Sequence, residues 1–448
     1  MGVTDLNSYG DELEQEPTSA EAYNERGWLK YEQKDYAGAI LDYDKAIELD
    51  PAFVDAYNNR GIAKYYKQDY TGAILDYDKA IELNPNYAEA YDNRGIVKCE
   101  QHNFDEAIKD YDKAIELDPN YANAYNNRAR AKYYKKDYTG AILNYDKAIE
   151  LDPTFVHAYN YRGVAKYYKQ DYTGAILDYD KAIELNPNYA EAYDNRGDAK
   201  YYKQDYTGSI LDYDKAIELD PTFVNAYKTR GLTKGELKDY TGAIKDFDKV
   251  IELDPNAEKA YNYRGLAKFY KHNYAGAILD YDKAIELNPN YADAYNNRAI
   301  AKCSQKNYDE AMKDYDKVIE LEPNSAKAYN NRGRGKCCQQ DYDEAIKDYD
   351  KAIELDPNCA KAYNNRGAAK RELKDYTGAI KDFDKVIELD PNYANAYNNR
   401  ARAKYYKKDY LGAIKDYNKT VGLKLDNVWL LIKLQVIRLK IKLLSKII

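Results

Sequence analysis

The side chains best suited to catalysis are few and scattered along the chain of 448 residues. It has three histidines, His102, His157 and His272, far apart in the sequence, and two of them fall where the pattern predicts a turn between helices. A triad, a dyad or a metal site needs its members to converge on one place. The histidines therefore suggest no catalytic centre, and we expect a protein that is not an enzyme.

The five cysteines give no metal or disulfide pattern either. Cys99, Cys303 and Cys337 occupy one phase of the repeat described below, Cys338 follows directly, and no Cys-x-x-Cys pair occurs. A structural zinc site needs such closely spaced pairs, and five cysteines are too few for a disulfide scaffold in a chain of this length. No stretch resembles GxxxxGK[ST], which cradles phosphates. We therefore predict no metal, no cofactor and a reducing, cytoplasmic location.

The net charge of the chain restricts the class of partner that it can bind. The formal net charge is −8 and the isoelectric point is near 5.3. Nucleic-acid binding needs a basic footprint that neutralises phosphates. The composition therefore argues against nucleic acid as a partner.

A 34-residue period positions all of these residues. The unit at residues 54–87 recurs twelve times between residues 20 and 426, and all twelve prolines, Pro17, Pro51, Pro85 and onward to Pro391, stand at one phase of it. Proline ends or kinks a helix, so the chain is divided into equal helical packets.

Each unit predicts two amphipathic helices. The first covers residues 54–67, the second begins after a capping Asp69, and Asn84-Pro85 stops it. The second helix has an apolar stripe at helical spacing, made of Tyr70, Ala73, Ile74, Tyr77, Ala80 and Ile81. Such a hairpin must stack on its neighbours to bury this stripe.

The unit resembles the tetratricopeptide repeat (TPR). Counted from Val54 as position 1, the family signature of an aromatic at 4, a small residue at 8, Ala at 20, an aromatic at 24, Ala at 27 and Pro at 32 is met by Tyr57, Gly61, Ala73, Tyr77, Ala80 and Pro85. One departure is systematic, since all twelve units have Arg at position 7 where the family usually has Leu. We expect this arginine to pair with the aspartate at position 23, as in Asp76 and Asp110.

The resemblance implies an all-α protein, a right-handed α-solenoid of stacked helix-turn-helix hairpins. We predict a degenerate half-repeat that caps the array at residues 1–19, twelve units at residues 20–426, and a separate helix at residues 427–448. The family lines its concave surface with the first helix of each unit, which implies that positions 2, 5, 6, 9, 12 and 13 face a ligand.

Two sets of residues at these positions are candidates for peptide binding. Position 6 is asparagine in eight units, and a side-chain amide both donates and accepts, so a ladder of amides can hold the backbone of an extended peptide. It resembles the asparagine ladder of the TPR superhelix of O-GlcNAc transferase. The eight are Asn59, Asn93, Asn127, Asn195, Asn297, Asn331, Asn365 and Asn399.

The second set is basic. Acidic side chains outnumber basic ones at the groove positions of units 1 to 6, and the reverse holds in units 7 to 12. Lys327, Arg334, Lys361 and Arg371 lie in adjacent units, so we expect an acidic segment of a partner to dock there.

Residues 427–448 leave three interpretations open. Acidic residues vanish in the stretch VWLLIKLQVIRLKIKLLSKII, whose apolar residues form one helical face and whose Arg438, Lys442 and Lys446 share another. Its charges offset the apolar gain of a membrane span. It can cover the last repeat, attach the protein to a membrane surface or partner, or represent an abnormal gene end.

The function expected from the sequence is a scaffold without catalysis that binds proteins or extended peptides and supports complex assembly. The alternative is a membrane-associated assembly factor attached through residues 427–448. The sequence names no partner and no oligomeric state.

Overall fold

The computed structural model describes residues 17–423 and contains helices from Ala20 to Leu423. The chain divides into two compact parts, residues 1–226 and 227–448, and the boundary falls inside one helix, α13. The helices are α1 (Ala20–Glu32), α2 (Tyr36–Leu49), α3 (Val54–Tyr66), α4 (Tyr70–Leu83), α5 (Ala88–Glu100), α6 (Phe104–Leu117), α7 (Ala122–Tyr134), α8 (Tyr138–Leu151), α9 (Val156–Tyr168), α10 (Tyr172–Leu185), α11 (Ala190–Tyr202), α12 (Tyr206–Leu219), α13 (Val224–Glu236), α14 (Tyr240–Leu253), α15 (Glu258–Tyr270), α16 (Tyr274–Leu287), α17 (Ala292–Ser304), α18 (Tyr308–Leu321), α19 (Ala326–Cys338), α20 (Tyr342–Leu355), α21 (Ala360–Glu372), α22 (Tyr376–Leu389), α23 (Ala394–Tyr406) and α24 (Tyr410–Leu423).

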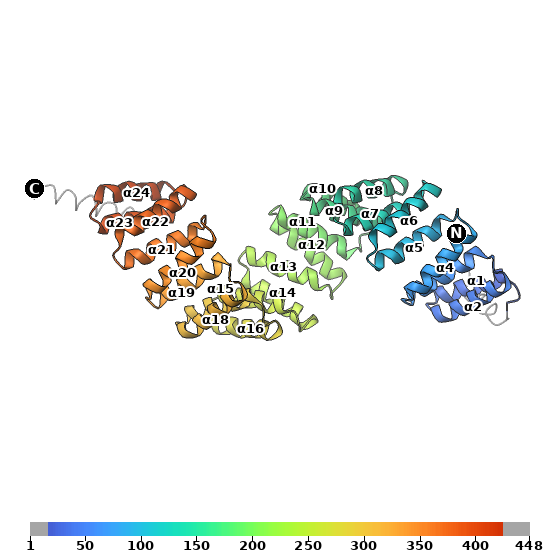
Figure 1. The fold of residues 1–448 in the computed structure, drawn as a ribbon, viewed down its shortest axis with the longest axis horizontal. Helices are drawn as coiled ribbons and strands as arrows, with labels where there is room; N and C mark the ends of the chain where they lie inside the picture. The colour runs from blue at the N-terminus through green and yellow to red at the C-terminus, as the bar shows by residue number, and fades with distance from the viewer. Residues whose placement is uncertain (1–16, 424–448) are drawn as a thin grey trace, which may run out of the picture. The chain divides into compact units, whose positions relative to one another are not determined.

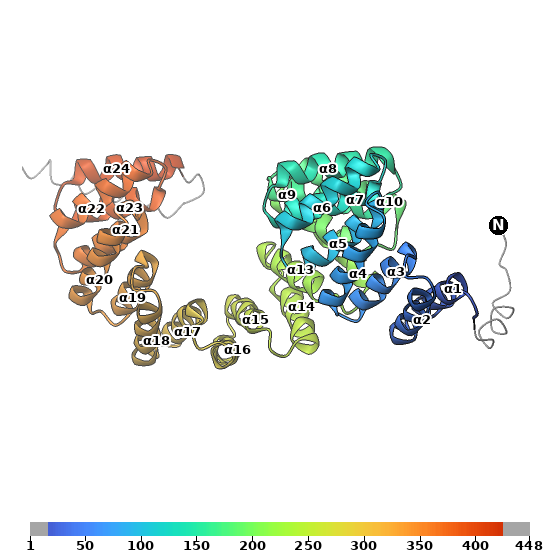
Figure 2. The same ribbon diagram turned by 45° about the vertical axis from the view of Figure 1, so that its right-hand side comes forward.

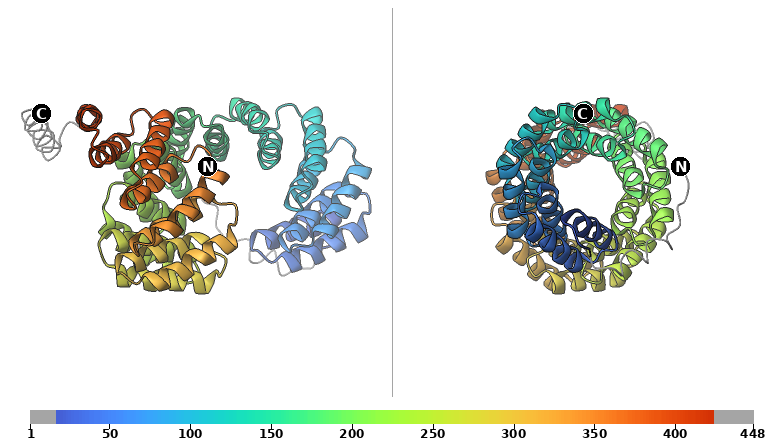
Figure 3. Two further views of the ribbon diagram at one scale, coloured as in Figure 1. Left: turned by 60° about the vertical axis from the view of Figure 1, so that its left-hand side comes forward. Right: turned by 90° about the vertical axis from the view of Figure 1, so that its right-hand side faces the viewer.

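Within each part the helices form hairpins that stack in chain order, as predicted (Figures 1 and 2). Within residues 20–219 and within residues 240–423, each odd-numbered helix packs against the even-numbered helix that follows it, and each even-numbered helix packs against the next hairpin of that range. Odd-numbered helices also contact the next odd-numbered helix, whereas no two even-numbered helices of the described residues meet. The odd-numbered helices are therefore the more closely spaced layer, and we call their exposed face the inner surface. Figure 3 shows the hairpins from two further directions.

Capping aspartates begin most second helices. Asp69 was predicted to cap α4, and its Oδ1 accepts a hydrogen bond from the backbone N–H of Gly72 at 2.9 Å. The same bond recurs in other units, for example from Gly174 to Asp171 at 2.9 Å. An N-cap side chain satisfies one of the backbone donors that a helix start leaves free. The predicted cap is confirmed.

The turn inside each hairpin uses a left-handed residue that is never glycine. Position 15 has a positive φ in all twelve units, for example 64° at Gln170. The N–H of Asp171 donates to the carbonyl of Lys166 at 3.0 Å, and the N–H of Gln170 donates to that of Tyr167 at 2.8 Å. These two bonds make a Schellman motif, which usually has glycine at this place. His102 and His272 occupy the same position, which places them in turns.

Small residues let the two helices of a hairpin approach closely. A Cβ added at Gly61 would lie 2.6 Å from Cε1 of Tyr77, a ring that is only 2% exposed. Ala73 and Ala80 are fully buried beside it. Small residues at positions 8, 20 and 27 thus pack around the buried ring at position 24, whereas the rings at positions 4 and 17, such as Tyr57 and Tyr70, are only half-buried.

The arginine at position 7 ties each hairpin to itself and to its predecessor. Arg162 donates from Nε and Nη2 to the two carboxylate oxygens of Asp178 at 3.0 and 2.6 Å, and from Nη1 to Asp146 of the preceding unit at 2.7 Å. Lys166 reaches the same Asp178 at 2.8 Å, and the guanidinium lies over the ring of Tyr159 at 5.4 Å. The predicted pairing with position 23 is confirmed. The bond to the preceding unit was not predicted.

Unit 4 is the exception in this network. Its position 23 is Asn144, whose Oδ1 accepts from Nε of Arg128 at 2.7 Å and whose Nδ2 donates to the carbonyl of Gly140 at 2.6 Å. Arg128 keeps its ion pair with Asp112 of the preceding unit at 2.6 Å. Lys132 has no carboxylate there to pair with. The network of this hairpin therefore has one carboxylate fewer than the networks of its neighbours.

The predicted half-repeat and the predicted terminal helix fall almost wholly outside the described residues. Of residues 1–19 only Pro17, Thr18 and Ser19 are described, and Ser19 caps α1 by accepting from the N–H of Ala22 at 3.2 Å. Residues 427–448 are not among the described residues.

Candidate peptide-binding surface

The side chains that differ most between units lie exposed on the odd-numbered helices. Position 2 is exposed in most units, as at Asp55, Lys327 and Lys361, and position 9 ranges from the exposed Arg334 to half-buried aliphatic residues such as Val164. Positions 7, 11 and 23, by contrast, are engaged in the internal network described above. The inner surface is therefore built on an invariant frame and carries variable side chains.

In seven of the twelve units position 5 is buried and does not face a ligand, contrary to expectation. Asn58 is 1% exposed and Asn160 is fully buried, because the next hairpin covers them. Asp92 and Asp194 are 3% exposed as well, so they do not contribute to the acidity of the inner surface. Burial raises the pKa of Asp92 to about 6, although hydrogen bonds from Asn127 and Tyr121 oppose this shift.

The position-6 asparagines form an internal ladder. Each donates from Nδ2 to the position-5 side chain of the preceding unit at 2.8–3.1 Å, for example from Asn195 to Asn160 and from Asn331 to Asn296. The other pairs are Asn59 with Asn24, Asn93 with Asn58, Asn127 with Asp92, Asn297 with Asn262, Asn365 with Asn330, and Asn399 with Asn364. One N–H donor of each of these asparagine amides is therefore used to hold its hairpin against the preceding one.

An asparagine amide has two N–H donors and a carbonyl oxygen, so each rung keeps polar capacity after this bond. Seven of the eight asparagines are half-buried, and Asn331 is buried at 9% exposure. A role in holding a peptide backbone stays a prediction, and it now competes with a structural role that the sequence did not reveal.

The four predicted basic residues are not equivalent. Lys327 lies 3.4 Å from Asp293, and both are exposed. Arg371 donates to Glu372 at 2.7 Å and to Asn399 at 3.4 Å, and its side chain is only 9% exposed. Arg334 and Lys361 are exposed, and neither has an ion pair within the described residues. The free positive charge of this region therefore comes mainly from Arg334 and Lys361.

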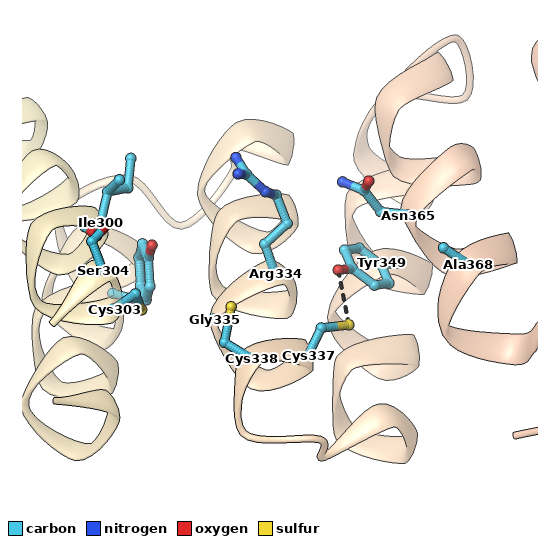
Figure 4. Close-up of a pocket in the computed structure, with 11 residues that line it drawn as sticks. Ile300, Cys303, Ser304, Arg334, Gly335, Cys337, Cys338, Tyr349, Asn365 and Ala368 are labelled. Atoms are coloured by element: carbon cyan, nitrogen blue, oxygen red, sulfur yellow. Dashed lines mark hydrogen bonds between the residues drawn. The ribbon is translucent and has the colours of Figure 1, made fainter. Parts of the chain in front are cut away.

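Arg334 lines a hollow of about 400 Å³ formed by α17, α19 and α21 with α18 and α20. Figure 4 shows its guanidinium and the Asn365 amide at one end of this hollow and the sulfur atoms of Cys337 and Cys338 at the other. Cys337 Sγ lies 3.3 Å from the hydroxyl of Tyr349. Two of the predicted binding residues therefore meet at one concavity, while Lys327, Lys361 and Arg371 lie outside its lining.

Two thiols of this hollow, those of Cys303 and Cys337, are not activated. Burial is the main cause that raises the pKa of Cys303 to about 11 and that raises the pKa of Cys337 above its ordinary value. A thiol needs a lowered pKa to act as a nucleophile near neutral pH. In residues 17–423 no group of three His, Cys, Asp or Glu side chains is placed to hold a metal ion.

Sequence comparison identifies the repeat. A family described as "TPR repeat" matches residues 27–68, 97–133, 129–170, 165–201, 197–238, 265–302 and 337–373, which together cover more than half of the chain. The description "Tetratricopeptide repeat" matches residues 54–87, 292–325, 360–393, 76–109 and 224–257. The chain belongs to the TPR family. Four of these matches, at residues 54, 224, 292 and 360, begin at the first residue of a TPR unit as counted above.

Solved TPR structures are similar in fold. Yeast Tom70 aligns at 21% identity over 94% of this chain and 96% of its own, with a TM-score of 0.48. MamA aligns at 32% identity over 38% of this chain and 94% of its own, with a TM-score of 0.35. YrrB, described as a TPR protein with an unusual peptide-binding site, aligns at 26% identity over 41% of this chain and 95% of its own, with a TM-score of 0.35. No curated protein sequence matches the chain.

The part of this TPR chain that the structure describes has no helix that is both long enough and apolar enough to cross a bilayer.

Proposed function

We propose that this TPR protein is a non-catalytic scaffold that binds proteins or extended peptides along its inner surface and supports the assembly of complexes. The observation that carries the proposal is that invariant and variable positions of the repeat have different roles. The invariant charged residues form the ties within and between hairpins, as Arg162, Asp178 and Lys166 show, whereas positions 2 and 9 vary between units and position 2 is exposed in most of them. Variable side chains on a rigid frame are what selective binding of a partner requires.

The partner includes an acidic segment that docks near units 10 and 11. Arg334 and Lys361 support this part of the proposal because they are exposed on neighbouring inner helices, α19 and α21, without an ion pair of their own. Charge complementarity of this kind acts more on the association rate and specificity than on affinity. Arg371 contributes less, since Glu372 offsets its charge.

The test uses the full-length chain as immobilised bait for affinity capture, followed by binding kinetics with each captured protein. We expect the double variant Arg334→Glu and Lys361→Glu to slow association with an acidic partner at low salt and to flatten the salt dependence of its rate. The matched control is Lys381→Glu with Lys415→Glu, which reverses two exposed lysines on the even-numbered helices α22 and α24. Equal rates for the double variant and the parent chain at low salt would remove the acidic-segment part of the proposal.

The scaffold itself is tested by the same capture. A bait that retains no protein above the background of a folded control helix bundle would contradict it. Replacing Asn297, Asn331 and Asn365 together with alanine tests the ladder, and we expect weaker peptide capture with helicity retained. Because each amide also bonds to the preceding unit, we expect a lower melting temperature as well.

A second candidate function rests on the composition of residues 427–448, which are apolar and basic. Such a segment can attach a protein to an anionic membrane surface. Co-sedimentation with phosphatidylserine vesicles, compared between the full chain and a chain ending at residue 426, separates the two candidates. Loss of partner capture without loss of vesicle binding on truncation would favour a docking role for the segment over a membrane role.

A further inference from the structure

Unit 7 lacks the aromatic ring that most units place at position 12. This position is half-buried on the inner helix, and it holds a tyrosine or phenylalanine in seven units, namely Tyr31, Tyr65, Tyr133, Tyr167, Tyr201, Phe269 and Tyr405. In unit 7 it is Gly235, and a Cβ added there would meet nothing within 4 Å. Glycine is an unfavourable residue inside a helix, and at Gly235 no close helix approach requires it.

Unit 5 shows the contacts that an aromatic ring at position 12 makes. Tyr167 packs against the buried cluster of Ala175, Tyr179 and Ala199 together with its neighbour Tyr172. Its ring centroid lies 5.5 Å from that of Tyr172 and 5.5 Å from that of Tyr202 in the next unit. The ring therefore bridges two consecutive hairpins.

Unit 7 keeps an equivalent buried cluster and the stacked pair of rings, but not the ring at position 12. The corresponding buried cluster is Ala243, Phe247 and Ala267, with Leu232 and Tyr240 packed against it. Tyr240 and Tyr270 of the next unit still stack, with centroids 5.2 Å apart. The space between them and position 12 is left without a side chain of the chain's own.

The result is a hollow of about 510 Å³ lined by α13, α14 and α15, on residues 231–270. Figure 1 labels these three helices. Its lining is mainly apolar and aromatic, with Leu232, Gly235, Tyr240, Phe247, Tyr263 and Tyr270. Glu236 and Lys238 are the charged residues of the lining. Binding sites for small groups are typically concave, mostly apolar and of this size.

We propose that this hollow receives the ring of a phenylalanine or tyrosine side chain presented by a protein segment bound along the inner surface. The chain itself indicates the occupant, because the same surroundings enclose a phenyl or phenol ring in seven other units. An incoming ring would meet Tyr240 and Tyr270 in the offset and edge-to-face geometries that aromatic pairs prefer. The inference rests on the proposed function, to which it adds the identity of one anchoring residue of the partner.

The first arm of the test measures the hollow alone, with p-cresol as the probe and the full-length chain in saturation-transfer NMR. We expect saturable binding to the parent chain and to Gly235→Ala, which adds a methyl group without filling the space. We expect at least a tenfold loss in Gly235→Phe and in Gly235→Tyr, which reproduce units 8 and 5. Both substitutions should raise the melting temperature of the chain. If one of the two variants does not fold, the other one is sufficient for the test.

Three results of this arm would overturn the inference. The first is absence of saturable binding to the parent chain, and the second is undiminished binding to a folded filled variant. The third is equal binding of 4-methylcyclohexanol, the saturated analogue, which would make the hollow a general apolar cavity rather than a ring site.

The second arm uses three 12-residue peptides that are identical except for a central Phe, Tyr or Ala. We expect the Phe and Tyr peptides to bind the parent chain and Gly235→Ala at least tenfold more tightly than the Ala peptide, and this preference to vanish in Gly235→Phe. Equal binding of all three peptides would leave the peptide-binding function standing and overturn the ring site. Binding of p-cresol with no binding of any peptide would overturn the anchor and count against the peptide-binding function itself.

Discussion

At the scale of single residues, the buried polar positions carry most of the information. Asp92 stands where nine of the twelve units have asparagine, and it is buried with a pKa raised to about 6. In unit 5 the equivalent Asn160 accepts from Asn195 and donates to the hydroxyl of Tyr189 at 3.2 Å. Neutral asparagine satisfies this place with no charge to desolvate, whereas the carboxylate is costly there.

We expect Asp92→Asn to stabilise the chain at neutral pH and to have little effect near pH 4. The folded state holds the Asp92 proton up to about pH 6, whereas the unfolded chain releases it near the ordinary value of 3.8. The folded state therefore binds more protons in this window, and stability falls as pH rises through it. A difference of two pKa units corresponds to about 3 kcal/mol at pH 7.

Thermal unfolding between pH 4 and pH 7.5 measures this effect. The exposed Asp343→Asn is the control, since its removal should leave the pH dependence of the parent chain in place. An Asp92→Asn chain that loses stability at pH 7.5 would show that the carboxylate is needed there for a reason other than charge.

Asn144 gives a second residue-scale prediction. Eleven units have aspartate at this position, held by an arginine and a lysine. We expect Asn144→Asp to stabilise unit 4 by about 1–2 kcal/mol, because a carboxylate would accept charge-assisted bonds from Arg128 and Lys132. Chemical denaturation checks the gain, which should shrink when Arg128 is replaced by Met. An unchanged midpoint would show that the desolvation of the new charge cancels its pairing.

At the scale of helices and turns, the hairpin closes through a left-handed residue that has a side chain. The Schellman bonds at Asp171 and Gln170 force a positive φ, which costs an L-residue roughly 1–2 kcal/mol. The chain accepts this cost in every unit. A residue that adopts a positive φ without this cost would therefore increase the stability of the chain at each of the turns.

We expect Gln170→Gly to stabilise its hairpin by about 1 kcal/mol, because glycine adopts positive φ without the Cβ clash. Part of the gain is lost to the greater freedom of glycine in the unfolded chain. Amide hydrogen exchange in α9 and α10 would report it as slower opening. Gln170→Ala is the control and should give no gain, because it keeps the Cβ; equal protection in both variants would refute the strain argument.

At the scale of the whole molecule, the array is modular within each part. Helices contact only the next one or two helices along the chain. Each boundary between units repeats the same ties, such as Arg162 with Asp146 and Asn195 with Asn160. Stability should then be close to a sum over units and their interfaces.

We therefore expect deletion of residues 156–189, one complete unit, to give a folded protein. The new junction joins Phe155 to Ala190, so a second helix is again followed by a first helix at the same phase. The helicity per residue by circular dichroism should match the parent chain, with a slightly lower unfolding midpoint. Deletion of residues 172–188, half a unit, is the control and should lose helicity or aggregate. Equal behaviour of both deletions would contradict the modular description.

The features that depend on local order could be predicted from the sequence alone. The 34-residue period, the two helices of each unit, the cap at Asp69 and the pairing of position 7 with position 23 all follow from spacing within one unit. Helix propensity, caps and side-chain periodicity act over a few residues, so they are readable without a fold.

Only the tertiary structure decided what happens between units. It buried position 5 in seven units, committed one donor of each ladder asparagine to the preceding hairpin, and joined Arg162 to Asp146. It also showed that losing one ring at Gly235 leaves an open hollow rather than a collapsed one. The physical reason is the same in each case: burial and hydrogen bonding depend on how the next hairpin packs, and close packing fixes that geometry only when whole hairpins meet.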